Sequence, residues 1–164
     1  MLIKNLVDED FVNYKKPSMF IIFPTCSFKC DKENGCQLCQ NSKLAQEPNI
    51  DVAIQHIVDR YISNPITKAI VCGGLEPLDS PDDLLELVRT LREQQVFDDI
   101  VIYTGYSEEE WFQMPVQSAL CAYDNIIIKF GRFRPGEEPH YDETLGVMLA
   151  SSNQYAKRVS NERI

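Results

Sequence analysis

Short apolar runs alternate along the chain with longer stretches of mixed polarity, a pattern typical of alternating strands and helices. A run that is apolar at every position suits a strand that is covered on both faces of a sheet. Four such runs predict buried strands: 18–23, 67–72, 100–103 and 125–130. Apolar residues at helical spacing, or a capping pattern, predict helices between them: 51–62, 81–91 with Ser80 as its N-cap, and a short helix after Ser107.

The repeated order of strand and helix predicts a parallel sheet with right-handed crossovers, because a parallel pair needs a long connection over one face. Four or five such units are fewer than the eight that close a barrel of about 250 residues. With 164 residues, the chain has the size of one domain. We therefore expect a single α/β domain over 1–164, built as a partial, open (β/α) barrel with parallel strands.

Charge and hydropathy argue against nucleic acids and membranes as partners. The chain carries 25 acidic and 16 basic side chains, a formal net charge of -9. A protein that coats DNA or RNA needs a basic face, so we expect no nucleic-acid partner. No apolar run is long enough to cross a bilayer, and residues 1–16 lack the apolar core of a signal peptide. We therefore expect a cytoplasmic protein without membrane contact, whose cysteines stay reduced.

Four of the six cysteines lie within fourteen positions of a loop at 25–42, directly after the first predicted strand, with the spacing Cys26-x3-Cys30-x5-Cys36-x2-Cys39. Ligand sites of α/β folds gather at the carboxyl ends of strands. Two chemistries fit this cluster. Four thiolates can close a tetrahedral zinc site, or three can hold a [4Fe-4S] cluster and leave one iron open for a substrate.

The segments Cys26-Ser-Phe-Lys-Cys30 and Leu38-Cys39-Gln40-Asn41 resemble the cluster motif of the radical S-adenosylmethionine (SAM) superfamily, in particular the small activases of glycyl-radical enzymes. The family motif is Cys-x3-Cys-x2-Cys, whereas eight residues separate Cys30 from Cys39 here. The resemblance implies Cys26, Cys30 and Cys39 as cluster ligands. Cys36 is a rival for the third position.

Further segments of the same family appear in order at predicted strand ends. Residues 73–77 (Gly-Gly-Leu-Glu-Pro) resemble its Gly-Gly-Glu-Pro segment with one inserted leucine, and 103–106 (Tyr-Thr-Gly-Tyr) resemble a segment of the activases of anaerobic ribonucleotide reductases. Taken alone, each could be an ordinary turn or strand end. Residues 131–133 and 150–154 also resemble segments of that group. The resemblance implies these SAM-binding residues: Leu38, Gly73, Gly74, Glu76, Pro77, Tyr103, Thr104 and Gly105.

The resemblance implies an enzyme of the radical SAM type, with a fold of that type and with a [4Fe-4S] cluster and SAM as cofactors. Such an activase cleaves SAM reductively to a 5′-deoxyadenosyl radical, which takes a hydrogen atom from a glycine of a partner enzyme. The implied partners are a glycyl-radical enzyme, such as an anaerobic ribonucleotide reductase, and an electron donor such as a flavodoxin or ferredoxin. Two alternatives remain: radical SAM chemistry on a small molecule or peptide, and a zinc-stabilised binding module that uses Cys26, Cys30, Cys36 and Cys39.

Overall fold

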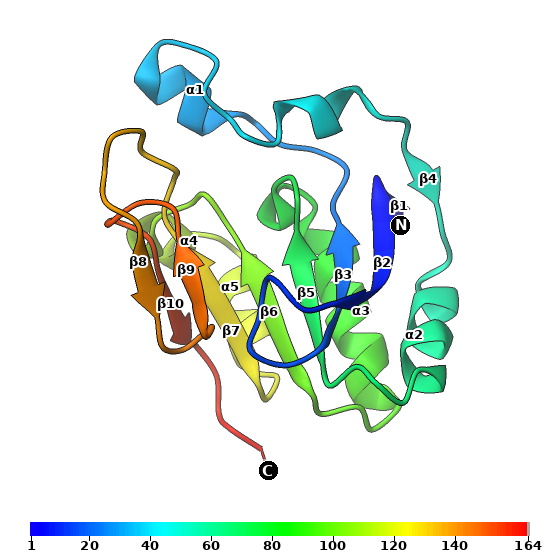
Figure 1. The fold of residues 1–164 in the computed structure, drawn as a ribbon. Coiled ribbons are helices and arrows are strands. Elements are labelled where there is room, and N and C mark those ends of the chain that lie inside the picture. Colours follow the sequence, from blue (N-terminus) through cyan, green and yellow to red (C-terminus); the bar gives the residue numbers. More distant parts are fainter. Residues whose placement is uncertain (164) are drawn as a thin grey trace.

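The computed structural model describes residues 1–163 and is organised around one six-stranded sheet of order β10-β7-β6-β5-β3-β2 (Figure 1). The six strands have these bounds: β2 (Asn5–Asp10), β3 (Ser18–Ile22), β5 (Ala69–Gly73), β6 (Asp99–Tyr103), β7 (Ile126–Phe130) and β10 (Tyr155–Arg158). The four central strands are parallel, in agreement with the four apolar runs of the sequence.

The two edge strands, β2 and β10, run antiparallel to their neighbours and are not paired with each other, so the sheet over residues 1–163 is open. The fold is therefore α/β with a largely parallel sheet, as expected. The sequence did not predict the edge strands, because one face of each is partly exposed. Asn5–Asp10, for example, reads as alternating exposed and half-exposed positions rather than as an apolar run.

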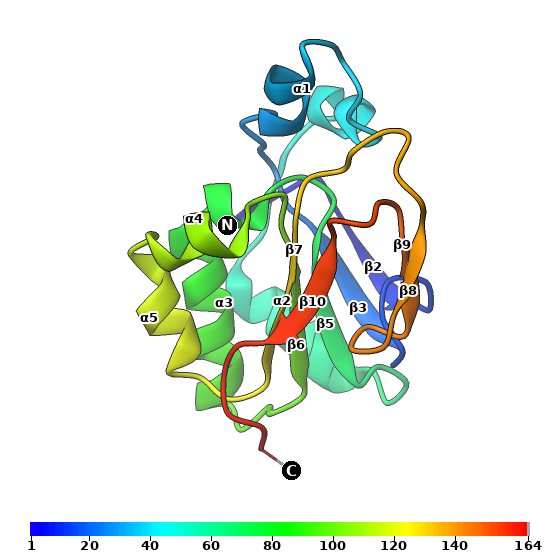
Figure 2. The ribbon, with the colours of Figure 1, turned by 90° about the vertical axis from the view of Figure 1, so that its left-hand side faces the viewer.

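Helices cover one face of the sheet and make the larger core (Figure 2). They are α2 (Ile54–Ser63), α3 (Pro81–Glu93), α4 (Glu108–Phe112) and α5 (Val116–Cys121). Leu84, Leu87 and Leu91 recur on one side of α3 and are fully buried against the sheet. In the described residues, no helix has the length and apolar character to span a bilayer.

The opposite face is covered by residues 11–16 and by a hairpin of β8 (His140–Asp142) and β9 (Val147–Leu149). Figure 2 shows this hairpin on the side of the sheet away from α3 and α5. Tyr14 and Leu145 are buried there with residues of the central strands, and the N–H of Lys15 donates to the carbonyl of Leu145 at 2.7 Å. This second core covers the face of the sheet opposite to the helices.

Local differences from the predicted elements have simple causes. The helix expected over 51–62 begins at Ile54, because β4 (Ile50–Asp51) pairs with β1 (Leu2–Ile3). Ser80 precedes α3 as expected, but its hydroxyl makes no capping hydrogen bond. The cysteine loop contains α1 (Lys29–Asn34) and a following 3-10 turn, η1 (Ser42–Gln46). A second 3-10 turn, η2 (Pro77–Asp79), leads into α3.

Candidate metal centre

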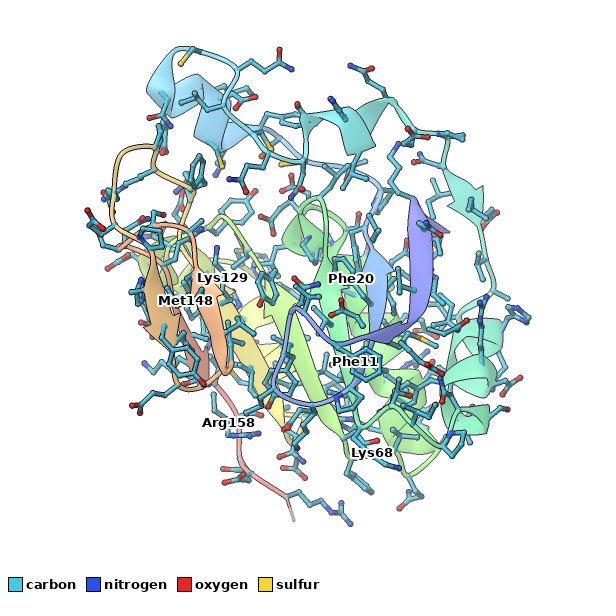
Figure 3. All side chains as sticks on the ribbon, viewed as in Figure 1. Phe11, Phe20, Lys68, Lys129, Met148 and Arg158 are labelled. Atoms are coloured by element: carbon cyan, nitrogen blue, oxygen red, sulfur yellow. The ribbon has the colours of Figure 1, made fainter. Side chains whose placement is uncertain are left out.

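The segments singled out in the sequence meet at one edge of the sheet. Parallel strands end at the same edge, and the loops after β3, β5, β6 and β7 carry the cysteines, residues 73–77, residues 103–106 and residues 131–133. Figure 3 shows sulfur atoms between α1 and this edge. A pocket lies here, and its lining residues are Cys26, Ser27, Lys29, Cys30, Glu76, Gly105, Tyr106 and Arg132.

Cys26, Cys30 and Cys39 are half-buried, whereas Cys36 is exposed. Burial raises the pKa of the Cys26 thiol to about 12, and Cys39 adds to the increase. Burial, followed by Cys39, also raises the pKa of Cys30. Cys39 is therefore within electrostatic reach of both other thiols. Cys36 lies on the outer side of the loop, where its thiol donates to the carbonyl of Asn34 at 3.5 Å.

The backbone around Cys26 and Cys30 turns N–H groups toward sulfur. Phe28 has a left-handed φ of 52°, and its N–H donates to the Sγ of Cys26 at 3.3 Å. The backbone N–H groups of Phe133 and Cys30 lower the pKa of the Cys30 thiol, against the larger effect of burial. Such donors suit thiolates that ligate a metal, because a bound metal replaces the thiol proton.

Within residues 1–163, no three His, Cys, Asp or Glu side chains converge as a group that could hold one metal ion. A zinc site requires its sulfur ligands about 2.3 Å from one point. In residues 1–163 the four cysteines do not form such a group, and Cys36 is the exposed member of the four. Cys26 and Cys30 line the pocket, and the half-buried Cys39 is within electrostatic reach of both.

The Gly-Gly-Leu-Glu-Pro turn places a buried carboxylate in the pocket. Gly74 has φ +80°, and a Cβ there would lie 2.4 Å from the Cγ2 of Ile22, so only glycine fits. Glu76 is 6% exposed and accepts hydrogen bonds from the N–H of Gly105 at 2.8 Å and of Leu78 at 3.1 Å. Burial raises the pKa of Glu76 to about 7 even though these donors act in the opposite direction.

The Tyr-Thr-Gly-Tyr segment is divided between the two faces of the sheet. Gly105 and Tyr106 line the pocket. The Thr104 hydroxyl is hydrogen-bonded to Glu76 and lowers the pKa of that carboxyl. The Tyr103 side chain points to the face of the sheet opposite to the helices, where its hydroxyl donates to the carbonyl of Asn13 at 2.5 Å. The structure therefore brings three of these four residues to the site.

Four other predicted SAM-binding residues, Leu38, Gly73, Gly74 and Pro77, do not line this pocket. Gly73 lies between Phe20 and Tyr103, and a Cβ there would come within 3.2 Å of both side chains. Pro77 is buried as the first residue of η2. Gly73 and Pro77 shape the strand end and the turn that hold Glu76, whereas Leu38 lies in the cysteine loop.

Two carboxylates that sequence reasoning missed clamp the cysteine loop. Asp79 accepts the N–H of Ser27 at 2.7 Å and the hydroxyl of Tyr106 at 2.5 Å. Glu110 accepts Arg132 Nη2 at 2.7 Å and lies 3.4 Å from Lys29 Nζ. The hydrogen bond from Arg132 is the main cause that lowers the pKa of Glu110 to about 2. The sequence offered one signal, the capping box in which Glu110 pairs with Ser107.

Lys129 was also missed, although a lysine within an apolar strand is itself a signal. It is 7% exposed, and its Nζ donates to the carbonyl of Gly131 at 2.8 Å (labelled in Figure 3). Burial lowers its pKa to about 8, while Glu76 and Cys30 act in the opposite direction. A buried cation therefore lies within electrostatic reach of both the carboxylate and one thiol of the site.

A second, larger pocket adjoins the first and shares Arg132 with it. Asn153 lines this second pocket. Gln154 instead closes the turn before β10, where its Oε1 accepts the N–H groups of Ala150 at 3.1 Å and Ser151 at 3.2 Å. Arg132 pairs with Glu110, and its Nε lies 3.3 Å from Glu33 Oε1.

Comparison with known proteins identifies a family for most of the chain. A family model described as a 4Fe-4S single cluster domain matches residues 17–156, from β3 to β10. This match supports a [4Fe-4S] cluster as a cofactor of the chain. No curated protein matches the chain.

Proposed function

The chain belongs to the family of 4Fe-4S single cluster domains, and from this premise we propose that it is a radical SAM enzyme that activates a glycyl-radical enzyme. The observation that carries the proposal is the position of Glu76. Its buried carboxylate shares a pocket with Cys26 and Cys30. An anionic group beside a cluster suits the amino group of an amino acid, and SAM carries one.

Cys26, Cys30 and Cys39 are the proposed cluster ligands. All three are half-buried, and Cys39 acts on the pKa of both other thiols, whereas Cys36 is exposed. Three thiolates leave one iron without a protein ligand. A [4Fe-4S] cluster held by these thiolates would supply the electron for reductive cleavage of a carbon–sulfur bond of SAM to methionine and a 5′-deoxyadenosyl radical. The electron comes from a flavodoxin or ferredoxin.

The other residues of the site position the reactants and limit the access of water. Glu76 accepts hydrogen bonds from the amino group of SAM, whose nitrogen would bind the open iron, and is itself fixed by the N–H groups of Gly105 and Leu78. Gly105 leaves room for the ligand, since a Cβ there would lie only 3.6 Å from Glu76 and 3.7 Å from Cys30 Sγ. Asp79 and Glu110 hold the cysteine loop over the pocket. No general base is required, because the reaction transfers a hydrogen atom rather than a proton.

The open sheet favours a protein as substrate. Its β2 and β10 edges are not joined, and the second pocket adjoins the site at Arg132. A flexible glycine-containing segment of a partner can reach such a site, whereas a closed barrel would enclose a small molecule. In the partner, the radical takes a hydrogen atom from a glycine Cα and becomes 5′-deoxyadenosine, which leaves a glycyl radical.

Anaerobic reconstitution with iron and sulfide, followed by dithionite and SAM, tests the proposal. We expect 5′-deoxyadenosine and methionine in equal amounts, and none from a Cys30→Ser variant. Addition of an anaerobic ribonucleotide reductase should then give a glycyl-radical signal by electron paramagnetic resonance (EPR). A chain that binds one zinc and no sulfide would be a zinc-stabilised module. Cleavage of SAM without a glycyl radical on any glycyl-radical enzyme would favour a small-molecule or peptide substrate.

A further inference from the structure

The chain between Cys30 and Cys39 leaves the site as a helix and returns to it. It forms α1 (Lys29–Asn34), which has no buried residue, and α1 ends at Gly35 with a left-handed φ of 68°. The side chain of Asn34 donates to the carbonyl of Cys30 at 2.7 Å and closes the last turn. The segment therefore gains no support from a hydrophobic core, and polar contacts must define its path.

One carboxylate oxygen joins the two ends of this excursion. Oδ1 of Asp31 accepts the N–H of Leu38 at 2.9 Å and the N–H of Cys39 at 2.8 Å. Asp31 follows Cys30 directly, so these two bonds connect the second cysteine to the backbone of Cys39 across eight positions. A carboxylate that accepts two backbone N–H groups forms charge-assisted hydrogen bonds, which are stronger than neutral ones.

We propose that Asp31 is the positioning residue that brings Cys39 to the cluster as its third ligand. The proposal rests on the proposed function only in that Cys39 ligates a cluster. The hydrogen bonds of Asp31 fold back the eight residues between Cys30 and Cys39. The thiols of these two cysteines can then be presented to a cluster as they would be if only two residues separated them. Cys36 lies between the two contacts, on the exposed outer part of the excursion, and is left out of the site.

The role of Asp31 is that of a hydrogen-bond acceptor. Its Oδ1 is the atom used in both contacts, and an asparagine carries an oxygen at the same place. Asp31→Asn should therefore keep most of the function, whereas Asp31→Ala removes the acceptor. Lys32→Ala is the matched control, because Lys32 is the next residue of α1 and is exposed.

The test measures iron and sulfide per chain after anaerobic reconstitution, together with the EPR spectrum of the reduced protein. We expect Asp31→Ala to lose at least half of the cluster, Asp31→Asn to retain most of it, and Lys32→Ala to match the wild type. In a Cys39→Ser background, Asp31→Ala should cause no further loss, because the two substitutions act through one ligand. Wild-type iron content and EPR spectrum in Asp31→Ala would overturn the proposal, as would an equal further loss in the Cys39→Ser background.

Far-ultraviolet circular dichroism of the metal-free variants controls for folding, and we expect no change because α1 buries no residue. The readout is independent of SAM chemistry. If the wild type holds a cluster but does not cleave SAM, the proposed function fails while the Asp31 experiment still gives its answer.

Discussion

The buried carboxylate of Glu76 accepts the backbone N–H of Gly105 at 2.8 Å, between the ends of two adjacent parallel strands. This bond joins the turn after β5 to the turn after β6, 29 positions apart in the chain. The hydrogen bond fixes the orientation of the Glu76 carboxylate, because the apolar side chains at the strand ends offer it no hydrogen-bond donor. The site therefore depends on a contact between two segments that the sequence shows only separately.

Gly105→Ala should block the pocket without unfolding the protein. The added Cβ would meet Glu76, Arg132 and Cys30 at 3.6 to 3.7 Å, which is ordinary contact distance, and Gly105 does not have a positive φ. We expect a melting temperature within about 3 °C of the wild type, since such a change costs under about 1 kcal/mol. The rate of 5′-deoxyadenosine formation should fall at least about tenfold. This corresponds to an increase of about 1.4 kcal/mol in the activation free energy. Unchanged activity would mean that SAM does not occupy this pocket.

The raised pKa of Glu76 makes the stability of the metal-free protein depend on pH. Between pH about 4.5 and about 7 the folded chain keeps the proton of Glu76 that the unfolded chain has lost, so the free energy of unfolding should fall as pH rises. The full contribution is about 3.5 kcal/mol, because the pKa rises from 4.5 to about 7 and a pKa difference of one corresponds to about 1.4 kcal/mol.

Urea unfolding at pH 5 and pH 8 measures this effect. Glu76→Gln should remove the difference attributed to Glu76, whereas Glu138→Gln, at an exposed position, should keep the wild-type dependence. The same pH dependence in the wild type and in Glu76→Gln would rule out a buried proton on Glu76.

Asp99 stabilises the end of the sheet opposite to the site. It accepts Tyr14 Oη at 2.9 Å, Lys16 Nζ at 2.5 Å and Arg158 Nη2 at 3.1 Å. Burial acts to raise the pKa of Asp99, but Lys16, Tyr14 and Arg158 outweigh it and hold the pKa below its usual value.

We expect Asp99→Asn to lower the free energy of unfolding by about 2 kcal/mol at pH 7, since it leaves buried donors with a weaker acceptor. The difference from the wild type should vanish as pH falls and the wild-type carboxylate is protonated. Cluster content should be unchanged, because Asp99 begins β6 and the site lies after its end. Chemical unfolding at pH 7 and pH 3 provides the comparison, and loss of the cluster in this variant would contradict the separation of the two ends.

Cys39→Ser and Cys36→Ser form a matched pair in one loop. Cys39 affects the pKa of two other thiols, and Cys36 is exposed. We expect Cys39→Ser to lose most of its iron and its SAM cleavage, and Cys36→Ser to retain both. Iron content and 5′-deoxyadenosine yield decide between them, and the reverse pattern would make Cys36 the third ligand.

The central strands could be predicted because both of their faces are covered, so each appears as an apolar run. The edge strands and the β8–β9 hairpin could not be predicted, because their residues alternate or the elements span only a few positions. The orientation of Tyr103 could not be predicted from its sequence segment either. Tyr103 was assigned to the ligand site from its segment, but only the alternation of side chains along β6 decides that it points to Asn13.

The residues that hold the site were the hardest to predict. Asp79 contacts Ser27 across 52 positions and Glu110 contacts Lys29 across 81, and no local pattern marks such pairs. The cysteines could be identified because four of them within fourteen positions indicate a metal or cluster site. The choice of Cys39 over Cys36 depended on flanking residues, and the structure adds the physical element, a helical excursion that closes on Asp31.

Electron–nuclear double resonance of the reduced, reconstituted protein can show whether SAM binds to an open iron of the cluster. SAM labelled with nitrogen-15 at its amino group is added to the reduced cluster, and the coupling between that nitrogen and the cluster is measured. We expect a clear nitrogen coupling in the wild type, because in the proposed site one iron has no protein ligand and would bind the amino group. A cluster signal without any coupling to the label, or a fourth cysteine bound to that iron, would contradict it.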